Sequence, residues 1–125
     1  MSNPTPSIPV SKVTVTGERH SSVNYLDEHG RPAGGHARGV VGFVIDWQDG
    51  PLGRVGSDER VEPNGAFVED VLLAVVDRLE FYQASDFRCR ENALAITKIE
   101  EALHWLESRT KRRVAAKVEG THEGS

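Results

Sequence analysis

The chain has 125 residues, 38% of them hydrophobic and 27% charged, and its formal net charge at pH 7 is −4. One soluble domain is expected at this length, and no apolar run approaches the roughly 20 residues that a membrane-spanning helix needs. The negative net charge argues against broad, sequence-independent binding of nucleic acid, so an anionic ligand has to be met by a local cluster of cationic side chains.

Residues 1–9 are expected to form a flexible leader, because three prolines and small polar residues can bury little apolar surface. The N-terminus lacks the basic start and apolar stretch of a secretory signal. Cys89 is the single cysteine, so no intramolecular disulfide is possible, and we expect an unreactive packing residue. These features favour a cytoplasmic protein.

Residues 10–63 are expected to form a small antiparallel β region of two or three strands. Apolar and polar residues alternate over Lys12–Gly17 and over Val40–Trp47, as in half-buried strands. The glycine-rich segment His29–Gly39 between them is interpreted as a loop, and a short strand is possible near Leu52–Val55. So thin a sheet needs another layer to cover its apolar face.

Residues 64–118 are expected to form a helical hairpin, followed by a C-terminal tail at 119–125. Apolar residues recur at three- and four-residue intervals over about 66–83, and Asn64 is placed to cap this helix. Ser85 or Asp86 is expected to cap a second helix over about 87–117, which contains no Gly or Pro. The predicted fold is therefore α+β, with one structural domain overall.

The second helix carries a stripe with alternating spacings of four and three: Asn92, Ile96, Ile99, Leu103, Leu106, Thr110 and Arg113. This is the spacing of a coiled-coil seam. Leu94, Ala95, Ala102 and Trp105 lie off the stripe, so the helix has more apolar surface than its partner in the hairpin covers. We expect oligomerisation through the helices; in the alternative, the sheet covers this surface in a monomer.

Cationic residues gather near the end of the second helix. Arg109, Arg113 and Lys117 are four residues apart and stack on one face, where like charges repel, so a negative group is expected among them. In the alternative explanation, the cations are there because they interact favourably with the negative end of the helix dipole, and because Lys111 pairs with Glu107. Arginine, however, also gives bidentate recognition of phosphate.

The corner of the hairpin combines an aromatic ring, an amide and arginines. Tyr82 is either a packing aromatic or a surface on which a purine stacks. Asn92 lies on an otherwise apolar stripe, where it caps the corner, sets the register of the helices, or binds a ligand.

Catalytic and metal-binding patterns are weak. The five histidines, at positions 20, 29, 36, 104 and 122, show no zinc-site spacing, and no nucleophile has a visible base partner. The sequence therefore predicts neither an enzyme nor a metal site or cofactor.

The segment from Arg90 to Thr110, with the closing run Val118-Glu119-Gly120-Thr121-His122, resembles the helical-hairpin domain of phage anti-defence sponges. The first Thoeris anti-defence family is the nearest match, and the anti-CBASS sponge is a more distant one. The resemblance implies cytoplasmic oligomers, hexamers built from dimers, which capture nucleotide immune signals in the infected bacterial cell without cleaving them. The implied ligands are glycocyclic ADP-ribose isomers and, in some members, cyclic di- or trinucleotides.

By this resemblance, the base-stacking aromatic falls on Tyr82, where the family usually has Phe, and the pocket amide falls on Asn92. The phosphate-facing arginines fall on Arg109 and Arg113. The resemblance also implies an arginine from the sheet half, for which Arg54, Arg60 and neither of the two all stay open. It further implies a second ligand site at Gly120, Thr121 and His122.

Together these features predict a homo-oligomeric sponge for a cyclic nucleotide signal. The alternative is a helical-hairpin module that docks a protein partner and binds no nucleotide, with the basic residues forming a solvated face.

Overall fold

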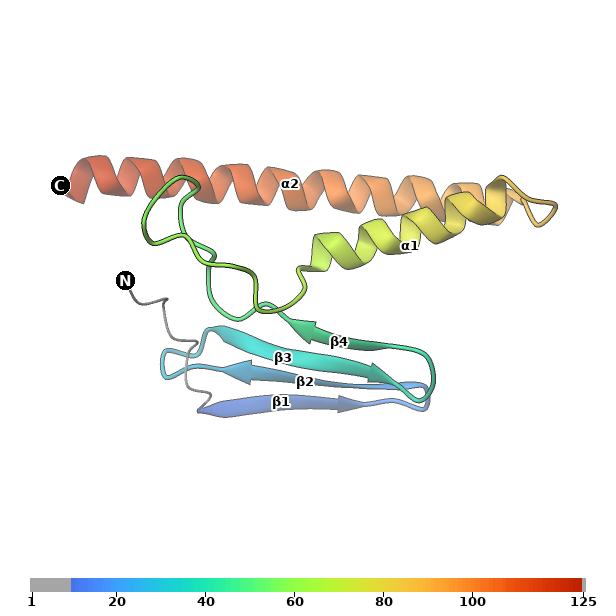
Figure 1. Ribbon diagram of the computed structural model, residues 1–125, viewed down its shortest axis with the longest axis horizontal. Helices are drawn as coiled ribbons and strands as arrows, with labels where there is room; N and C mark the ends of the chain where they lie inside the picture. The colour runs from blue at the N-terminus through green and yellow to red at the C-terminus, as the bar shows by residue number, and fades with distance from the viewer. Residues whose placement is uncertain (1–9, 125) are drawn as a thin grey trace. The chain divides into compact units, whose positions relative to one another are not determined.

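The computed structural model describes the backbone of residues 10–124 and the side chains of residues 10–116. Four strands precede two helices, which confirms the predicted α+β class (Figure 1). The chain divides into two compact units, a sheet unit that ends at Val68 and a helical unit that begins at Glu69. None of the described helices is both long and apolar enough to cross a bilayer.

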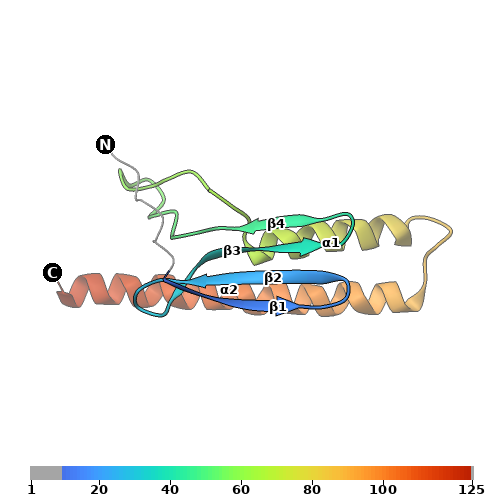
Figure 2. The ribbon, with the colours of Figure 1, turned by 90° about the horizontal axis from the view of Figure 1, so that it is seen from below.

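The sheet unit is an antiparallel meander in which every strand pairs with the next along the chain (Figure 2). Its strands are β1 (Ser11–Thr16), β2 (His20–Leu26), β3 (Pro32–Gly39) and β4 (Val44–Trp47). The sheet thus has four strands where two or three were expected.

Strand β3 occupies most of the segment that was predicted to be a loop. That prediction was wrong because the small residues allow close approach to β2. A Cβ on Gly35 would overlap the carbonyl oxygen of Val23, and the φ of Gly35 is 135°, a conformation that other residues rarely adopt. Ala33 and Ala37 on the same strand are the two buried apolar residues of the described sheet unit.

The expected strand Val40–Trp47 is only half formed. Its first part is a turn, in which the Gly39 N–H donates to the Phe43 carbonyl at 3.0 Å, and Gly42 has a φ of 94°. The short strand considered near Leu52 is a loop instead, closed by the Val61 N–H bonded to the Leu52 carbonyl at 2.7 Å. The alternation of apolar residues therefore predicted too long a strand. A turn pairs the backbone N–H and C=O groups as well as a strand does, so the alternation does not distinguish the two.

Asn64 does not cap the first helix, contrary to the expectation. Its side chain bonds the backbone of Asp49 twice, accepting from the N–H and donating to the carbonyl, each at 2.8 Å. Gln48 completes this joint by accepting from the N–H groups of Asn64 and Gly65. Asn64 therefore fixes the loop against the end of β4, where Trp47 forms a bridge with Ala66.

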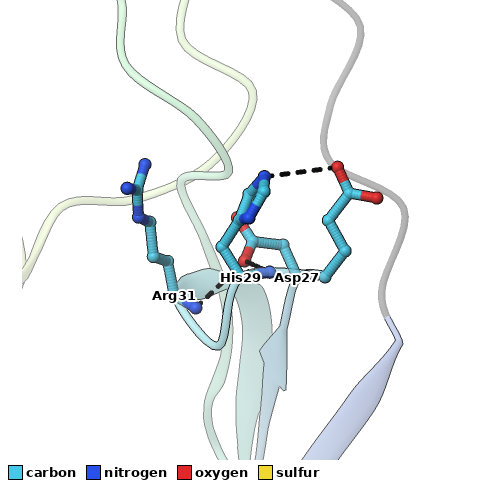
Figure 3. Close-up of polar contacts among 4 residues, drawn as sticks. Asp27, His29 and Arg31 are labelled. Atoms are coloured by element: carbon cyan, nitrogen blue, oxygen red, sulfur yellow. Dashed lines mark hydrogen bonds and ion pairs between the residues drawn. The ribbon is translucent and has the colours of Figure 1, made fainter.

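The turn between β2 and β3 is organised by Asp27 (Figure 3). One carboxylate oxygen accepts the N–H groups of His29 at 2.8 Å and Arg31 at 3.0 Å. The bond from Arg31 is the main cause that holds the pKa of Asp27 below its ordinary value, against a smaller opposing effect of desolvation. The charged form of Asp27 thus favours the folded turn.

We expect Asp27→Ala to lower the melting temperature at pH 7 and to lower it less in acid. The folded pKa of Asp27 is depressed, so its contribution is complete above the unfolded pKa of about 3.9 and disappears as pH falls through the folded value. Thermal denaturation of both proteins from pH 7 to pH 3 measures the difference. Glu28→Ala is the control, since this exposed neighbour has one ion pair within the described part of the chain, with His29 at 3.4 Å. A difference for Asp27→Ala that stays constant over this range would contradict the assignment.

The two helices are α1 (Val68–Gln83), which lies in the helical unit except for its first residue, and α2 (Arg90–Gly124). A short loop that reverses the chain direction joins them (Figure 1). Helix α2 extends beyond its expected end near residue 117. The cap of α2 is Cys89, rather than Ser85 or Asp86: its carbonyl accepts the Ala93 N–H, and its sulfur accepts the Asn92 N–H at 3.4 Å.

The predicted seam of α2 is correct in its apolar part. Among residues 90–116 of this helix, the half-buried ones are Asn92, Ala95, Ile96, Ile99, Leu103, Leu106 and Arg109. At the far end the seam continues through Arg109, whereas Thr110 and Arg113 are exposed. Val76, at 7% exposure, is the one buried apolar residue of the described helical unit, so most of the seam is only partly covered.

Candidate functional site

The corner of the hairpin holds Tyr82 in the last turn of α1 and Asn92 in the first turn of α2. The connecting loop is fixed by Gln83, whose side-chain amide donates to the Cys89 carbonyl and accepts its N–H, at 3.0 and 2.9 Å. Ser85 adds a bond from its hydroxyl to the Tyr82 carbonyl at 2.6 Å. These bonds give the two predicted ligand residues a defined backbone position.

Asn92 and Tyr82 are both half-buried. Asn92 bonds to Cys89 through its backbone, and its side-chain amide has no hydrogen bond to another described residue. The Tyr82 ring has a partner that the sequence analysis did not identify: Arg78, one helical turn earlier, donates from Nε to the Tyr82 hydroxyl at 3.2 Å. The i,i+4 spacing of these two residues was a usable signal.

Arg109 lies at the other end of the hairpin, in contact with the beginning of α1. Its Nη2 is 3.6 Å from a carboxylate oxygen of Glu69, and about a third of each side chain is exposed. The distance is that of a loose ion pair, longer than a good hydrogen bond. The Nε of Arg109 is buried and has no hydrogen-bond partner among the described residues. Arg109 therefore holds a buried donor without a partner among the described residues, which is uncommon in a folded protein.

The other cations of this region differ from Arg109. Lys111 pairs with Glu107 at 3.3 Å, as the helix spacing predicted, and this exposed pair contributes little to stability. Arg113 is exposed, one helical turn beyond Arg109. The cluster is thus one half-buried arginine followed by solvent-facing cations.

Within one chain the predicted site residues form two separate groups. Asn92 and Arg109 are 17 positions apart on a continuous helix, which is about 25 Å at 1.5 Å per residue. Tyr82 is in the last turn of α1 and Asn92 in the first turn of α2, whereas Arg109 and Arg113 are in the second half of α2. Figure 1 shows how the loop between the two helices forms the corner of the hairpin. A single copy does not bring the four residues to one nucleotide.

The remaining candidates fall outside this geometry. Gly120, Thr121 and His122 belong to the last part of α2, where side chains lie outside the described residues. In the sheet unit, Arg60 donates from Nη1 to the Gly53 carbonyl at 2.8 Å and so helps to close its own loop, whereas the Arg54 side chain is exposed. No group of three potential metal ligands among His, Cys, Asp and Glu occurs in the described part of the chain.

The region that matches known proteins includes the end of the sheet unit and most of the hairpin. The family model described as Acb2/Tad1, hairpin domain, matches residues 42–111, more than half of the chain. The chain belongs to this family. The resemblance found in the sequence, to phage anti-defence proteins with a helical hairpin, is thereby confirmed.

A curated relative extends this result. The chain is 48% identical over 80 residues to a Bacillus phage SBSphiJ7 protein named Thoeris anti-defense 1. The matched region covers 64% of this chain and 52% of the relative, so it spans about half the length of that protein.

Proposed function

We propose that the protein counters the Thoeris defence by binding a cyclic nucleotide immune signal, glycocyclic ADP-ribose, and holding it intact in the cytoplasm of the infected cell. Membership of the Acb2/Tad1 hairpin family and the name of the phage relative support this role. The observation that carries it is Arg109, a half-buried guanidinium with a loose ion pair and a buried Nε that has no hydrogen-bond partner among the described residues.

Each predicted site residue has a role that suits its environment. Arg109 and Arg113 hold the pyrophosphate through charge-assisted hydrogen bonds. Tyr82 stacks on the adenine, and the side-chain amide of Asn92 bonds to a polar edge of the ligand. A stoichiometric sponge needs nanomolar affinity, about −12 kcal/mol, to compete with an immune effector. Stacking and two phosphate contacts supply a large share of that.

The two groups of residues meet only if two copies combine. A second copy packed antiparallel along α2 would place its Arg109 beside the Asn92 of the first, which removes the separation of about 25 Å. The helical unit has the apolar surface for such packing: Trp105 is 72% exposed, and Phe81, Leu94 and Val114 are exposed as well. A homo-oligomer is therefore part of the proposal, and the resemblance to the sponge family adds that it is a hexamer built from dimers.

Binding of cyclic di- or trinucleotides at Gly120, Thr121 and His122 is a further part of the same proposal. The basis is the resemblance of the run Val118–His122 to the anti-defence sponges. Titration with a cyclic trinucleotide after saturation with glycocyclic ADP-ribose tests for this separate site.

Sequestration is tested by mixing the purified protein with glycocyclic ADP-ribose, removing free ligand by filtration and heating the retained fraction. We expect the ligand to stay with the protein and to be recovered unchanged after heating, at up to one equivalent per site. Protein denatured before mixing is the control. Failure to retain the ligand would contradict binding, and recovery of a cleaved product would identify an enzyme instead.

A further inference from the structure

One arginine of the described chain contacts both aromatic rings at the end of α1. The Cζ of Arg78 lies 4.9 Å from the centroid of the Tyr82 ring and 5.3 Å from that of the Phe81 ring. Both distances fall within the range of a cation–π interaction. Together with the bond from Nε to the phenol oxygen, at 3.2 Å, Arg78 contacts the Tyr82 side chain at two points.

These two contacts restrict the ring. A tyrosine rotates about two side-chain bonds, and a partner on the ring face together with another on the hydroxyl disfavours the alternative rotamers. Arg78 itself is exposed and contributes little to the packing of α1. Its contacts therefore bear on the orientation of Tyr82 more than on the stability of the helix.

The direction of the hydrogen bond from Arg78 determines whether the Tyr82 hydroxyl is free to donate or to accept a further bond. Arginine is only a donor, so the Tyr82 oxygen acts as the acceptor toward Arg78. The phenol proton remains to be donated, and no acceptor for it is present among the described residues. A bond received from a cationic group also strengthens the phenol as a donor, because successive hydrogen bonds polarise one another.

We infer that Arg78 is a positioning residue for the nucleotide site: it orients the Tyr82 ring and directs the Tyr82 hydroxyl to donate a hydrogen bond to the bound nucleotide. The guanidinium occupies one face of the ring, and the base stacks on the other. This inference rests on the proposed function. It adds that Tyr82 recognises an acceptor atom of the ligand as well as its aromatic surface.

The test is a double-mutant cycle by isothermal titration with glycocyclic ADP-ribose, using Tyr82→Phe, Arg78→Met and the double variant. Tyr82→Phe keeps the stacking ring and removes the hydroxyl, and we expect about 5- to 10-fold weaker binding. Arg78→Met is expected to weaken binding by a similar factor, and the double variant by no more than the larger single effect, because both changes remove the same interaction. Lys98→Met, which removes an exposed cation of α2, is the control for net charge.

A second measurement isolates the positioning role from binding. The Tyr82 ¹³Cζ resonance reports the hydrogen bond at the hydroxyl, and in the ligand-free protein we expect it to shift in Arg78→Met and not in Lys98→Met. An unchanged resonance, independent losses that multiply in the double variant, or wild-type affinity for Tyr82→Phe would each overturn the inference. If Tyr82→Ala abolishes binding while Tyr82→Phe does not, the proposed function stands and only the inference fails. If the wild-type protein binds no ligand, both fail.

Discussion

Arg109→Ala is expected to weaken the binding of glycocyclic ADP-ribose by about 10- to 150-fold, the equivalent of about 1.5–3 kcal/mol for hydrogen bonds to a charged group. The effect is large because charge-assisted hydrogen bonds are strong, and because Arg109 is half-buried whereas its cationic neighbours Lys111, Arg112 and Arg113 are exposed and do not share its position. Isothermal titration measures the loss. Circular dichroism checks that α2 is intact.

The matched control is Arg112→Ala, which makes the same change of charge three positions further along the same helix, at an exposed residue. We expect less than a threefold change in affinity, because a solvent-exposed charge acts only through a screened field. Equal losses for both variants would mean that the cluster attracts the ligand by general charge and that Arg109 has no specific contact.

Gly35→Ala is expected to give the largest loss of stability among single substitutions in the sheet unit, beyond the 4–5 kcal/mol that is exceptional for a point change. Two effects add: a Cβ would overlap the Val23 carbonyl oxygen on β2, and a φ of 135° strains any side chain. Because β2 and β3 form the centre of the sheet, their separation would disrupt its pairing. Urea denaturation followed by far-ultraviolet circular dichroism measures the change.

Gly30→Ala separates the two effects. Gly30 has a φ of 75° in the β2–β3 turn, but a Cβ there meets nothing within 4 Å. We expect a cost of only about 1–2 kcal/mol from the left-handed conformation. If the two variants lost a similar free energy of unfolding, the close approach of the strands at Gly35 would not be the cause of the larger loss that we expect there.

The helical half of the fold could be predicted well from the sequence, and the sheet half only in part. The three- and four-residue spacing of apolar residues indicated α1 and the seam of α2, because one helical face has to be buried. Strand β3 was missed, since Gly34, Gly35 and Gly39 resemble a loop in composition. The reason for each glycine is a neighbour that is distant or unplaced in the sequence: the β2 backbone at Gly35, the Asp49 side chain at Gly34 and the Phe43 ring at Gly39.

The candidate site, like the fold, could be predicted from the sequence only in part. The sequence by itself was enough to single out Tyr82, Asn92, Arg109 and Arg113 from their types and spacing, and the ligand roles that the family resemblance implies for them remain predictions. Only the tertiary structure decided what surrounds them. Glu69 comes to Arg109 because the antiparallel hairpin brings residues 40 positions apart into contact. Tyr82 on α1 and Asn92 on α2 lie at the corner of the hairpin, whereas Arg109 and Arg113 lie about 25 Å or more further along α2. Local patterns encode local periodicity, whereas partners and distances depend on how the chain folds back on itself.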